Sequence, residues 1–567
     1  MEDRTEELEN IVVAKKMHRR SDDYAKSDTT VVRRTSNNSS FGNRRNSSSS
    51  TASRSTRSST TNTGKKKPAS NKKKSGKKLV KKKVKVIAGV VTAISFAFTL
   101  TFCVLLFNLK MLPGLYFGIL CVILLAMIAG IAFMMFGAKK IQRLLGGVVL
   151  SLIFDILMGT GIYYINVSTK ALKNITTTKT EVALVDVYVR SDDAAQSIQD
   201  TNGYTFGILT ELDRDNTDET VKKINKDLGY EIATSEYSSY VDMVNALENG
   251  EINAFILNTA YIDIIKDMPD YENIEDRIKS VAEYKIKQKK IVADKEEPTD
   301  KHVFTVYVSG IDSREGLVAN SRSDVNILLT INTDTKQILM VNTPRDYYIP
   351  LSISGGARDK LTHAGIYGVD VSMATLSMLY NINVDYYFRV NFSGFEQIVD
   401  ALGGVDVNST YSFYSSLSEP FVGTAYYYNE GMNHLNGSEA LYFSRERYNL
   451  PGGDNDRGKN QMAVIQGIVS KMTSTDFLMN YTGVLDSLQG SFETSIPMDL
   501  ISSIVRDQLS NGGDWNIVNY AVTGTGDTQV PWSMGTGAYV MWPNEDTVAT
   551  ATSLMQQVEN GEVITQP

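Results

Sequence analysis

The sequence predicts an α/β protein whose chain begins with membrane-spanning helices. Three apolar runs within residues 84–167 are each close to the length needed to cross a bilayer. Strand-like and helix-like segments then alternate in two blocks, at 181–295 and 302–561, which predicts two α/β domains. Residues 1–83 are rich in Ser, Thr, Asn, Lys and Arg and hold few apolar residues, so we expect a disordered tail there.

Charge is strongly segregated along the chain. Residues 1–86 carry about 24 Lys and Arg against 8 Asp and Glu, whereas residues 170–567 carry about 30 against 55. The lysine cluster ends directly before the first apolar run, which favours binding to anionic lipid headgroups over binding to nucleic acid. The only two cysteines, Cys103 and Cys121, lie in apolar runs, so a disulfide framework or a thiolate zinc site outside the membrane is excluded.

Each apolar run is expected to form one membrane helix. The three spans are 84–109, 115–136 and 145–167. Basic residues favour the cytoplasmic side, so the tail and the loop holding Lys139, Lys140 and Arg143 should both be cytoplasmic. Three crossings then place everything after residue 167 outside, which predicts a multi-pass cell-membrane protein with a cytoplasmic N-terminus. Asp155 lies in the third run and is either functional or hydrogen-bonded to a neighbouring helix, the second being at least as favoured.

The middle block predicts a small α/β accessory domain. Strands are expected at 204–209, 231–234 and 254–257, and helices at 217–227, at 240–249 and from 260 onward. The stretch 247–256 resembles part of one lobe of periplasmic solute-binding proteins. Because a second lobe is missing, we expect a spacer or protein-docking module, followed by a charged connector at 279–301.

The last block predicts a larger α/β domain. Strands are expected at 303–309, 326–331 and 337–342, and helices at 371–379, 394–402 and 456–472. In the last helix, an apolar set is expected to face the core: Met462, Ile465, Ile468, Val469 and Met472.

Arginine-bearing motifs are spread over this block. They are Asp312-Ser-Arg314, Arg322-Ser-Asp324, Pro344-Arg345-Asp346, Arg445-Glu-Arg447 and Asp456-Arg457. Mg²⁺ is usually held by one or two carboxylates plus substrate phosphates, and the arginine fork matches phosphate oxygens, so the set predicts metal-assisted phosphate chemistry.

Strand ends bring several of these motifs together. Asp312 and Arg314 follow the strand at 303–309, and a loop of about eight residues can fold back so that Arg322 and Asp324 meet them. Arg457 and Gln461 stand four apart on one helix and share a face. Arg445 and Arg447 would share a side if their segment were extended.

Two kinds of neighbouring residue are given structural roles. Asp346 is expected to orient Arg345 through an ion pair rather than to bind metal. His363 and His434 lack partners at metal-ligand spacing and are expected to be packed or surface histidines.

These motifs resemble those of the LytR-CpsA-Psr (LCP) family of cell-envelope proteins. The pattern that carries the resemblance is Gly310-Ile-Asp312-Ser-Arg314, Arg322-Ser-Asp324, Thr343-Pro-Arg345-Asp346, Lys360-Leu-Thr-His-Ala364, Val399-Asp400-Ala-Leu-Gly-Gly-Val405, Leu435-Asn-Gly437, Ser444-Arg445-Glu-Arg447 and Asp454-Asn-Asp-Arg457 with Asn460-Gln461. It is strong over roughly 302–475, and the three spans with the middle domain resemble the streptococcal capsule-type branch.

The resemblance implies a fold and an activity. The fold would be an α/β/α domain with a central mixed sheet. The activity would be that of a Mg²⁺-dependent phosphotransferase, with Mn²⁺ as another metal, in the envelope of a Gram-positive bacterium. It would move an anionic or capsular glycopolymer from a polyprenyl pyrophosphate carrier onto peptidoglycan.

The resemblance also implies residue roles. Asp312 and Asp324 would hold the metal, and Asp312 is also a candidate base. The pyrophosphate would be gripped by Arg345, Arg445, Arg447, Arg457 and Gln461. Arg314 and Arg322 would complete the cationic cradle, and the polyprenyl tail would lie in an apolar tunnel, at about 0.8 kcal/mol for each buried methylene.

Two other functions stay open from the sequence. A pyrophosphatase acting on the lipid carrier needs the same cradle but no polymer acceptor. A non-enzymatic envelope sensor or transcription regulator would act through the basic tail and would leave the arginine motifs without a purpose.

Overall fold

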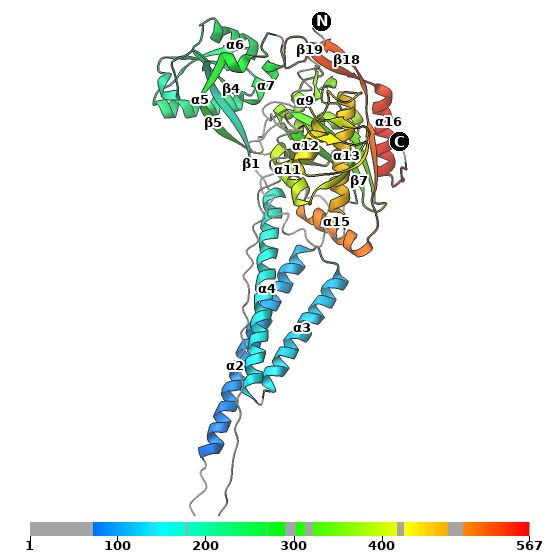
Figure 1. Ribbon diagram of the computed structural model, residues 1–567. Helices are drawn as coiled ribbons and strands as arrows, with labels where there is room; N and C mark the ends of the chain where they lie inside the picture. Colours follow the sequence, from blue (N-terminus) through cyan, green and yellow to red (C-terminus); the bar gives the residue numbers. More distant parts are fainter. Residues whose placement is uncertain are drawn as a thin grey trace, which may run out of the picture. The chain divides into compact units, whose positions relative to one another are not determined.

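The computed structural model describes residues 72–138, 140–176, 180–268, 270–289, 302–311, 321–416, 425–474 and 492–565 (Figure 1). Residues 1–71, most of the predicted disordered tail, lie outside these ranges.

Three apolar helices begin the described chain, as predicted. They are α2 (Lys72–Leu109), α3 (Gly114–Phe136) and α4 (Ile141–Thr176). Each contains a stretch long and apolar enough to cross a membrane, namely Lys82–Leu109, Gly114–Phe136 and Ile141–Lys170. The expectation of disorder is wrong for residues 72–83, which belong to α2. Lysine is a good helix former, and extending an existing helix is far easier than starting one.

Asp155 lies in a small polar network within the apolar bundle. The Ser151 hydroxyl donates to Asp155 at 3.4 Å, and the Ser95 hydroxyl on α2 lies 2.7 Å from that of Ser151 on α4. The hydrogen bond of Asp155 thus lies within α4, and Ser151 makes the contact with α2, so the expected bond to a neighbouring helix is present only indirectly.

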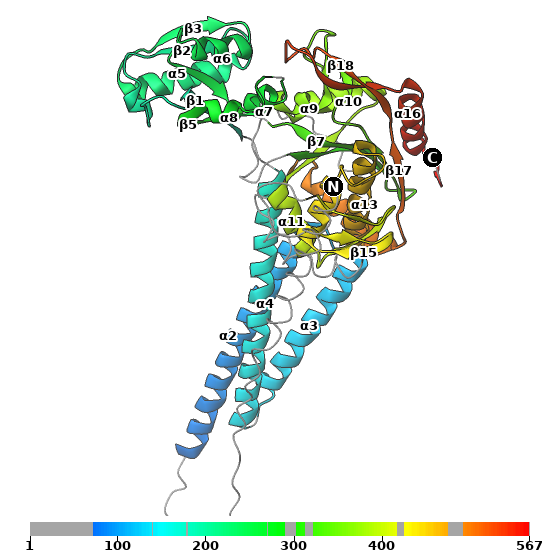
Figure 2. The same ribbon diagram turned by 45° about the horizontal axis from the view of Figure 1, so that its top comes forward.

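The accessory domain has a five-stranded sheet in the order β3-β2-β4-β1-β5 (Figure 2). Its strands are β1 (Thr180–Arg190), β2 (Thr205–Leu209), β3 (Ala233–Tyr237), β4 (Ala254–Asn258) and β5 (Ile278–Lys289). Its helices are the short η1 (Ile198–Asp200), α5 (Arg214–Leu228), α6 (Tyr240–Glu248), α7 (Ala260–Lys266) and α8 (Ile274–Arg277). Strand alternation puts Phe206 and Ile256 in one apolar cluster with Ile224 of α5, and Phe255 and Leu257 in another with α6 and α7. The domain is therefore a three-layer α/β sandwich.

Strands β1 and β5 of this sheet were not expected. Residues 279–301 were predicted to form a connector, but their first part is β5, which pairs antiparallel with β1. Val281, Tyr284 and Ile286 point into the apolar cluster, whereas Lys285 and Lys287 are exposed. Lysines on the outer face are a common protection for an edge strand, and here they made the strand resemble a linker.

The C-terminal domain is built on a six-stranded mixed sheet in the order β16-β11-β6-β7-β8-β17. The strands are β6 (Val303–Ile311), β7 (Ser323–Asn332), β8 (Gln337–Asn342), β11 (Tyr386–Asn391), β16 (Phe492–Thr494) and β17 (Asn516–Ala521). The pairs β6–β11 and β8–β17 are parallel, and the other three are antiparallel. The predicted mixed sheet is confirmed.

Helices cover both faces of this sheet. On one face α13 (Asp454–Met472) and α15 (Met498–Asn511) pack on residues such as Val306 and Ile327. On the other face α10 (Val369–Tyr380) and α16 (Glu545–Glu559) pack on residues such as Tyr307 and Leu328. The α/β/α arrangement is therefore also confirmed.

The C-terminal domain contains further short strands and helices outside these layers. They are β9 (Tyr348–Pro350), β10 (Arg358–Lys360), α9 (Leu361–Ala364), η2 (Gly365–Tyr367), α11 (Phe392–Ala401), β12 (Val405–Ser409), β13 (Phe413–Tyr414), β14 (Tyr427–Tyr428), β15 (Gly431–Leu435), α12 (Gly437–Arg445), β18 (Gly524–Gln529) and β19 (Ala538–Pro543).

One edge of the sheet collects the predicted motifs. The carboxyl ends of β6, β8 and β11 meet there, and antiparallel β7 begins there. Asp324 therefore lies at the start of β7 beside Arg345, which follows β8. Open α/β sheets commonly bind ligands at this edge.

Candidate active site

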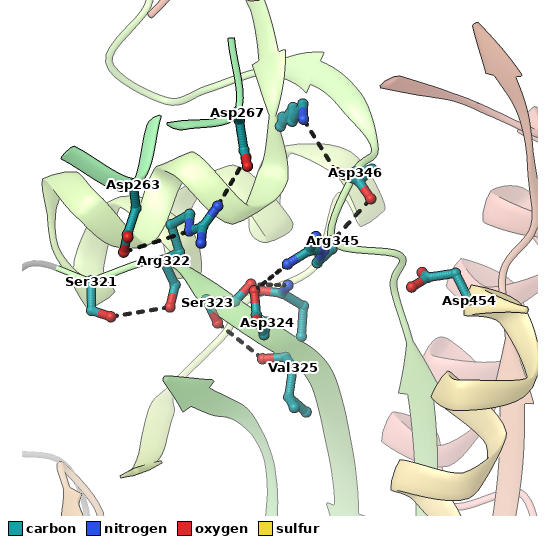
Figure 3. A network of polar contacts seen from close by, with 12 residues as sticks. Asp263, Asp267, Ser321, Arg322, Ser323, Asp324, Val325, Arg345, Asp346 and Asp454 are labelled. Carbon is teal, nitrogen blue, oxygen red and sulfur yellow. Dashed lines mark hydrogen bonds and ion pairs between the residues drawn. The ribbon is translucent and has the colours of Figure 1, made fainter. Parts of the chain in front are cut away.

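A mostly buried ion pair forms the centre of the site. Arg345 donates from Nη1 to Asp324 Oδ1 at 2.8 Å, and the two side chains are 19% and 20% exposed (Figure 3). Burial alone would raise the pKa of Asp324, but the charges of Arg345, Arg322 and Arg457 outweigh it and hold that pKa below its ordinary value. Asp324 thus stays ionised and raises the pKa of Arg345 in turn, against the effect of burial.

Arg345 keeps hydrogen-bonding capacity beyond this pair. Its Nε lies 3.6 Å from Asp346 Oδ2, and Lys360 Nζ lies 3.6 Å from Asp346 Oδ1. The expected contact between Asp346 and Arg345 is present, although Asp324 is the nearer partner. Within the described part of the chain, Arg345 Nε has no hydrogen-bond acceptor. The guanidinium group can therefore still bind an anionic ligand.

Helix α13 brings Arg457 close to this pair. Arg457 is 12% exposed and lies 2.5 Å from Asp454. Burial lowers its pKa, while Asp454 and Asp324 favour its charged form. The close approach depends on Gly458, because a Cβ there would collide with the amide group of Asn342 at the end of β8.

Arg445, Arg447 and Gln461 lie near the same place. The extended segment that would put Arg445 and Arg447 on one side is not present, because Arg445 ends helix α12. Its guanidinium stacks on the Phe392 ring at 4.3 Å. Arg447 follows the helix and donates to the Tyr448 hydroxyl at 2.7 Å. Gln461 donates to the Ser444 carbonyl at 3.3 Å.

These groups stand at the wall of a largely apolar cavity of about 630 Å³. Its apolar wall comes from the sheet and from helices α11, α12 and α13. The charged and polar side chains at this wall include Asp324, Arg345, Arg445, Arg447, Arg457 and Gln461. Ile465, Ile468 and Val469 pack against the core as expected and also line the cavity, as does Met472. Six of the predicted site residues, from four separate motifs, therefore share one cavity.

A second, polar cavity of about 690 Å³ adjoins the first. Its polar lining side chains are Asp267, Arg345, Asp346, Lys360, Arg447, Tyr448, Asp454 and Tyr539. Arg345, Arg447 and Tyr448 belong to both cavities. Two cations therefore lie where an apolar chamber meets a polar one.

Three predicted site residues stand apart from this arrangement. Arg322 is among the described residues but lines neither cavity; it contacts the accessory domain, with Nη1 2.9 Å from Asp267 Oδ2 (Figure 3). Asp312 and Arg314 lie outside the described residues.

A divalent metal was predicted between Asp312 and Asp324. Within the described ranges, no three His, Cys, Asp or Glu side chains cluster in a way that could hold a metal ion. Asp324 does supply one ionised carboxylate at the cavity wall. Since Mg²⁺ is commonly held by one or two carboxylates and otherwise by substrate phosphates, the donor set fits a metal that binds together with its substrate.

The two histidines have carboxylate partners. His363 is fully buried, and its Nδ1 lies 2.7 Å from Asp359 Oδ1 and 3.0 Å from the Ser533 hydroxyl. A hydrolytic triad needs the serine and the carboxylate on opposite ring nitrogens, so this group is a packed polar cluster. His434 pairs with Asp406 on the surface.

Sequence reasoning missed three residues of the polar cavity: Asp267, Tyr448 and Tyr539. Tyr448 directly follows Arg447 in the sequence, so it could have been predicted as a site residue from its position next to that motif. Asp267 belongs to the accessory domain and Tyr539 to β19, and neither carries a local signal that points to the site.

Comparison with known proteins gives two family matches. The model of the LytR_cpsA_psr family matches residues 271–556, about half of the chain. A model described as DNA polymerase processivity factor matches residues 145–257, which include part of α4 and most of the accessory domain.

Characterised relatives match the C-terminal domain. The polyisoprenyl-teichoic acid–peptidoglycan teichoic acid transferase TagU of Enterococcus faecalis is 32% identical over 256 residues, 45% of this chain and 77% of the relative. The protein of the same name from Bacillus subtilis is 31% identical over 248 residues, 44% of this chain and 75% of the relative. The crystal structure of B. subtilis TagU covers 47% of this chain and 100% of its own, at 27% identity and a TM-score of 0.36.

Proposed function

This chain belongs to the LytR-CpsA-Psr family, and from that premise we propose that it is a phosphotransferase that attaches a polyprenyl-pyrophosphate-linked glycopolymer to peptidoglycan. The observation that carries the proposal is the meeting of an apolar and a polar cavity at Arg345 and Arg447. A lipid-linked sugar diphosphate has an apolar lipid, a charged diphosphate and a polar sugar in that order, which matches the apolar cavity, the two arginines and the polar cavity. The relatives named above are teichoic acid transferases, so an anionic glycopolymer, teichoic or capsular, is the substrate class.

Each part of the carrier binds the region of the site that has the same polarity or the opposite charge. The polyprenyl tail occupies the apolar cavity, where methylene groups contact Ile468 and Val469 instead of water. The pyrophosphate binds the cationic junction, since arginines meet phosphate oxygens with charge-assisted hydrogen bonds. The sugar end extends into the polar cavity toward Tyr448 and Tyr539.

The reaction is a single displacement at phosphorus. A hydroxyl oxygen of peptidoglycan attacks the phosphorus that bears the glycopolymer, and the bond from that phosphorus to the bridging oxygen breaks. Polyprenyl monophosphate leaves, a glycopolymer phosphodiester remains, and the hydroxyl proton passes to a base, for which Asp312 is the candidate. Arg345, Arg447 and Arg457 stabilise the charge that develops on the phosphoryl and leaving oxygens.

A divalent cation, Mg²⁺ or Mn²⁺, belongs to this proposal. Asp324 would hold it, and Asp312 would hold it too if another group takes the hydroxyl proton, because a carboxylate bound to a metal is a weaker base. The bound cation would neutralise phosphate charge. Because Asp324 also receives a hydrogen bond from Arg345, the arginine keeps the carboxylate ionised and oriented before substrate arrives.

The proposal also includes a topology. The three apolar helices anchor the chain in the membrane, with the N-terminus cytoplasmic and both α/β domains outside, where peptidoglycan is found. Cleavage by an external protease in intact cells, restricted to the part after α4, tests this orientation.

The decisive experiment measures transfer by the full-length protein in lipid nanodiscs. A polyprenyl pyrophosphate-linked oligosaccharide, Mg²⁺ and peptidoglycan fragments are supplied, and the product is analysed for a new phosphodiester. Arg447→Ala should abolish most turnover. Arg358→Ala is the matched control, because Arg358 stacks on Trp542 and lines neither cavity.

Product identity separates this proposal from its alternatives. Release of a glycan phosphate monoester and polyprenyl monophosphate, without coupled product, would indicate a pyrophosphatase instead. A cellular function that survives Arg447→Ala but is lost when residues 1–71 are deleted would indicate a sensor acting through the tail.

A further inference from the structure

The accessory domain reaches the catalytic domain through two carboxylates. Asp267 Oδ2 lies 2.9 Å from Nη1 of Arg322, and Asp263 Oδ2 lies 3.9 Å from its Nε (Figure 3). Both carboxylates come from the region of helix α7, whereas Arg322 directly precedes β7. The Arg322 side chain is only 14% exposed, so this ion pair is more shielded from water than an ordinary surface pair.

The contact stands beside a packed interface. Tyr261 and Ile265 of α7 belong to the same buried apolar cluster as Ile366 and Met534 of the catalytic domain. The rings of Tyr261 and Tyr367 meet edge to face, with centroids 6.4 Å apart. Because this apolar contact fixes α7 against the catalytic domain, the carboxylates beside it are held in place rather than swinging on a free linker.

Asp267 also contributes to the polar cavity. It lines the polar cavity, in whose wall Arg345 and Arg447 also stand. Its partner Arg322 directly precedes β7 and stands two residues before Asp324, so the ion pair with Asp267 is made next to the central carboxylate. One carboxylate of the accessory domain is thus connected to the central ion pair both through the cavity and through Arg322.

We propose that Asp267 is a positioning residue of the phosphotransfer site, and that the accessory domain completes that site by fixing the Arg322 guanidinium. This inference rests on the proposed function. With Asp267 in place, the Arg322 guanidinium is paired with Asp267, and among the described residues Arg345 is the side chain that donates to Asp324. Without it, Arg322 is free to turn to Asp324 and to compete with Arg345, which disturbs the cradle that receives the pyrophosphate.

The test compares variants of the full-length protein in nanodiscs, using the transfer assay described above. Asp267→Asn removes the charge with little change in size and should lower kcat about tenfold, the lower end for removing a residue that orients a catalytic group. Asp263→Asn, at the longer distance, should lower kcat less. Asp267→Glu restores the charge and should recover most of the loss.

Asp218→Asn is the matched control. Asp218 also pairs with an arginine, Arg214, at 2.7 Å, but both residues lie within the accessory domain. Melting temperatures are recorded for every variant, because a purely structural role would lower the melting temperature together with the activity, whereas a positioning role lowers kcat at an unchanged melting temperature. Should Asp267→Asn fail to fold, Asp263→Asn must still be less active than Asp218→Asn.

Each result has one interpretation. Transfer by the wild type with equal kcat for Asp267→Asn and Asp218→Asn overturns this inference and leaves the proposed function standing. Faster transfer by Asp267→Asn also overturns it, because the carboxylate would then be withholding Arg322 from substrate. Absence of any coupled product with the wild type refutes the proposed function and this inference with it.

Discussion

Replacing Arg345 by lysine tests whether the shape of this cation, and not only its charge, is needed. The guanidinium group donates to Asp324 at 2.8 Å, lies 3.6 Å from Asp346, and stands in the wall of both cavities. Lysine keeps the charge but replaces a planar fork with a single ammonium group. It can hold Asp324 or the pyrophosphate well, but not both.

The expected loss is that of one hydrogen bond to a charged group. Such a bond contributes about 1.5–3 kcal/mol, which corresponds to a fall of roughly 10- to 150-fold in kcat/KM. The assay is the initial rate of phosphodiester formation at subsaturating carrier. Arg358→Lys, outside both cavities, controls for the substitution itself. Equal rates for the two variants would refute the assignment of Arg345 to the phosphate site.

Three further predictions follow from other parts of the molecule. Val469→Trp partly fills the apolar cavity about 18 Å along α13 from Arg457, so it should slow transfer from long polyprenyl carriers and spare short ones; equal slowing of both would contradict a lipid site there. Asp324→Asn should lower the melting temperature at neutral pH. The pKa of Asp324 in the folded protein is below its value of about 3.9 in the unfolded chain, so the ionised carboxylate stabilises the fold when the pH is above about 3.9. The difference in melting temperature between variant and wild type should therefore close as the pH falls below about 4; a difference independent of pH would exclude this ion pair as its cause. Glu493→Gln leaves buried Arg389 without the carboxylate that lies 3.0 Å away and should cost about 3 kcal/mol, a fall of roughly 6–12 °C in melting temperature; an unchanged value would mean that the pair adds no net stability.

The fold was predictable from the sequence wherever one physical signal dominated. Length and apolarity identified the three helices that are long enough to span a membrane, and period and chain breakers identified three strands and three helices in each α/β domain. The signal failed where two causes give the same pattern. The lysines of β5 mark a protected edge strand, but they look like a charged connector until β1 is known to lie beside it.

The site was predictable as a set of motifs but not as a shape. The motif order suggested that Arg345, Arg447 and Arg457 belong together, and the structure brings them to one cavity, while their roles stay predictions. An apolar cavity was expected only from the family resemblance, because an apolar helix face has the same spacing whether it meets a core or a lipid chamber. The partner of Arg322 could not be predicted either, since Asp267 precedes it by 55 residues and comes from another domain.

The strand order of the C-terminal sheet determines at which point of synthesis the domain can complete its folding. Its two outer strands, β16 and β17, both follow α13 in the chain, yet they flank opposite sides of a sheet whose inner strands are made much earlier. A chain delivered N-terminus first therefore exposes β11 and β8 with open hydrogen-bonding edges until residue 521 has emerged. Folding of such a chain favours chaperones that shield unpaired strands, and fragments that stop after α13 should aggregate rather than fold.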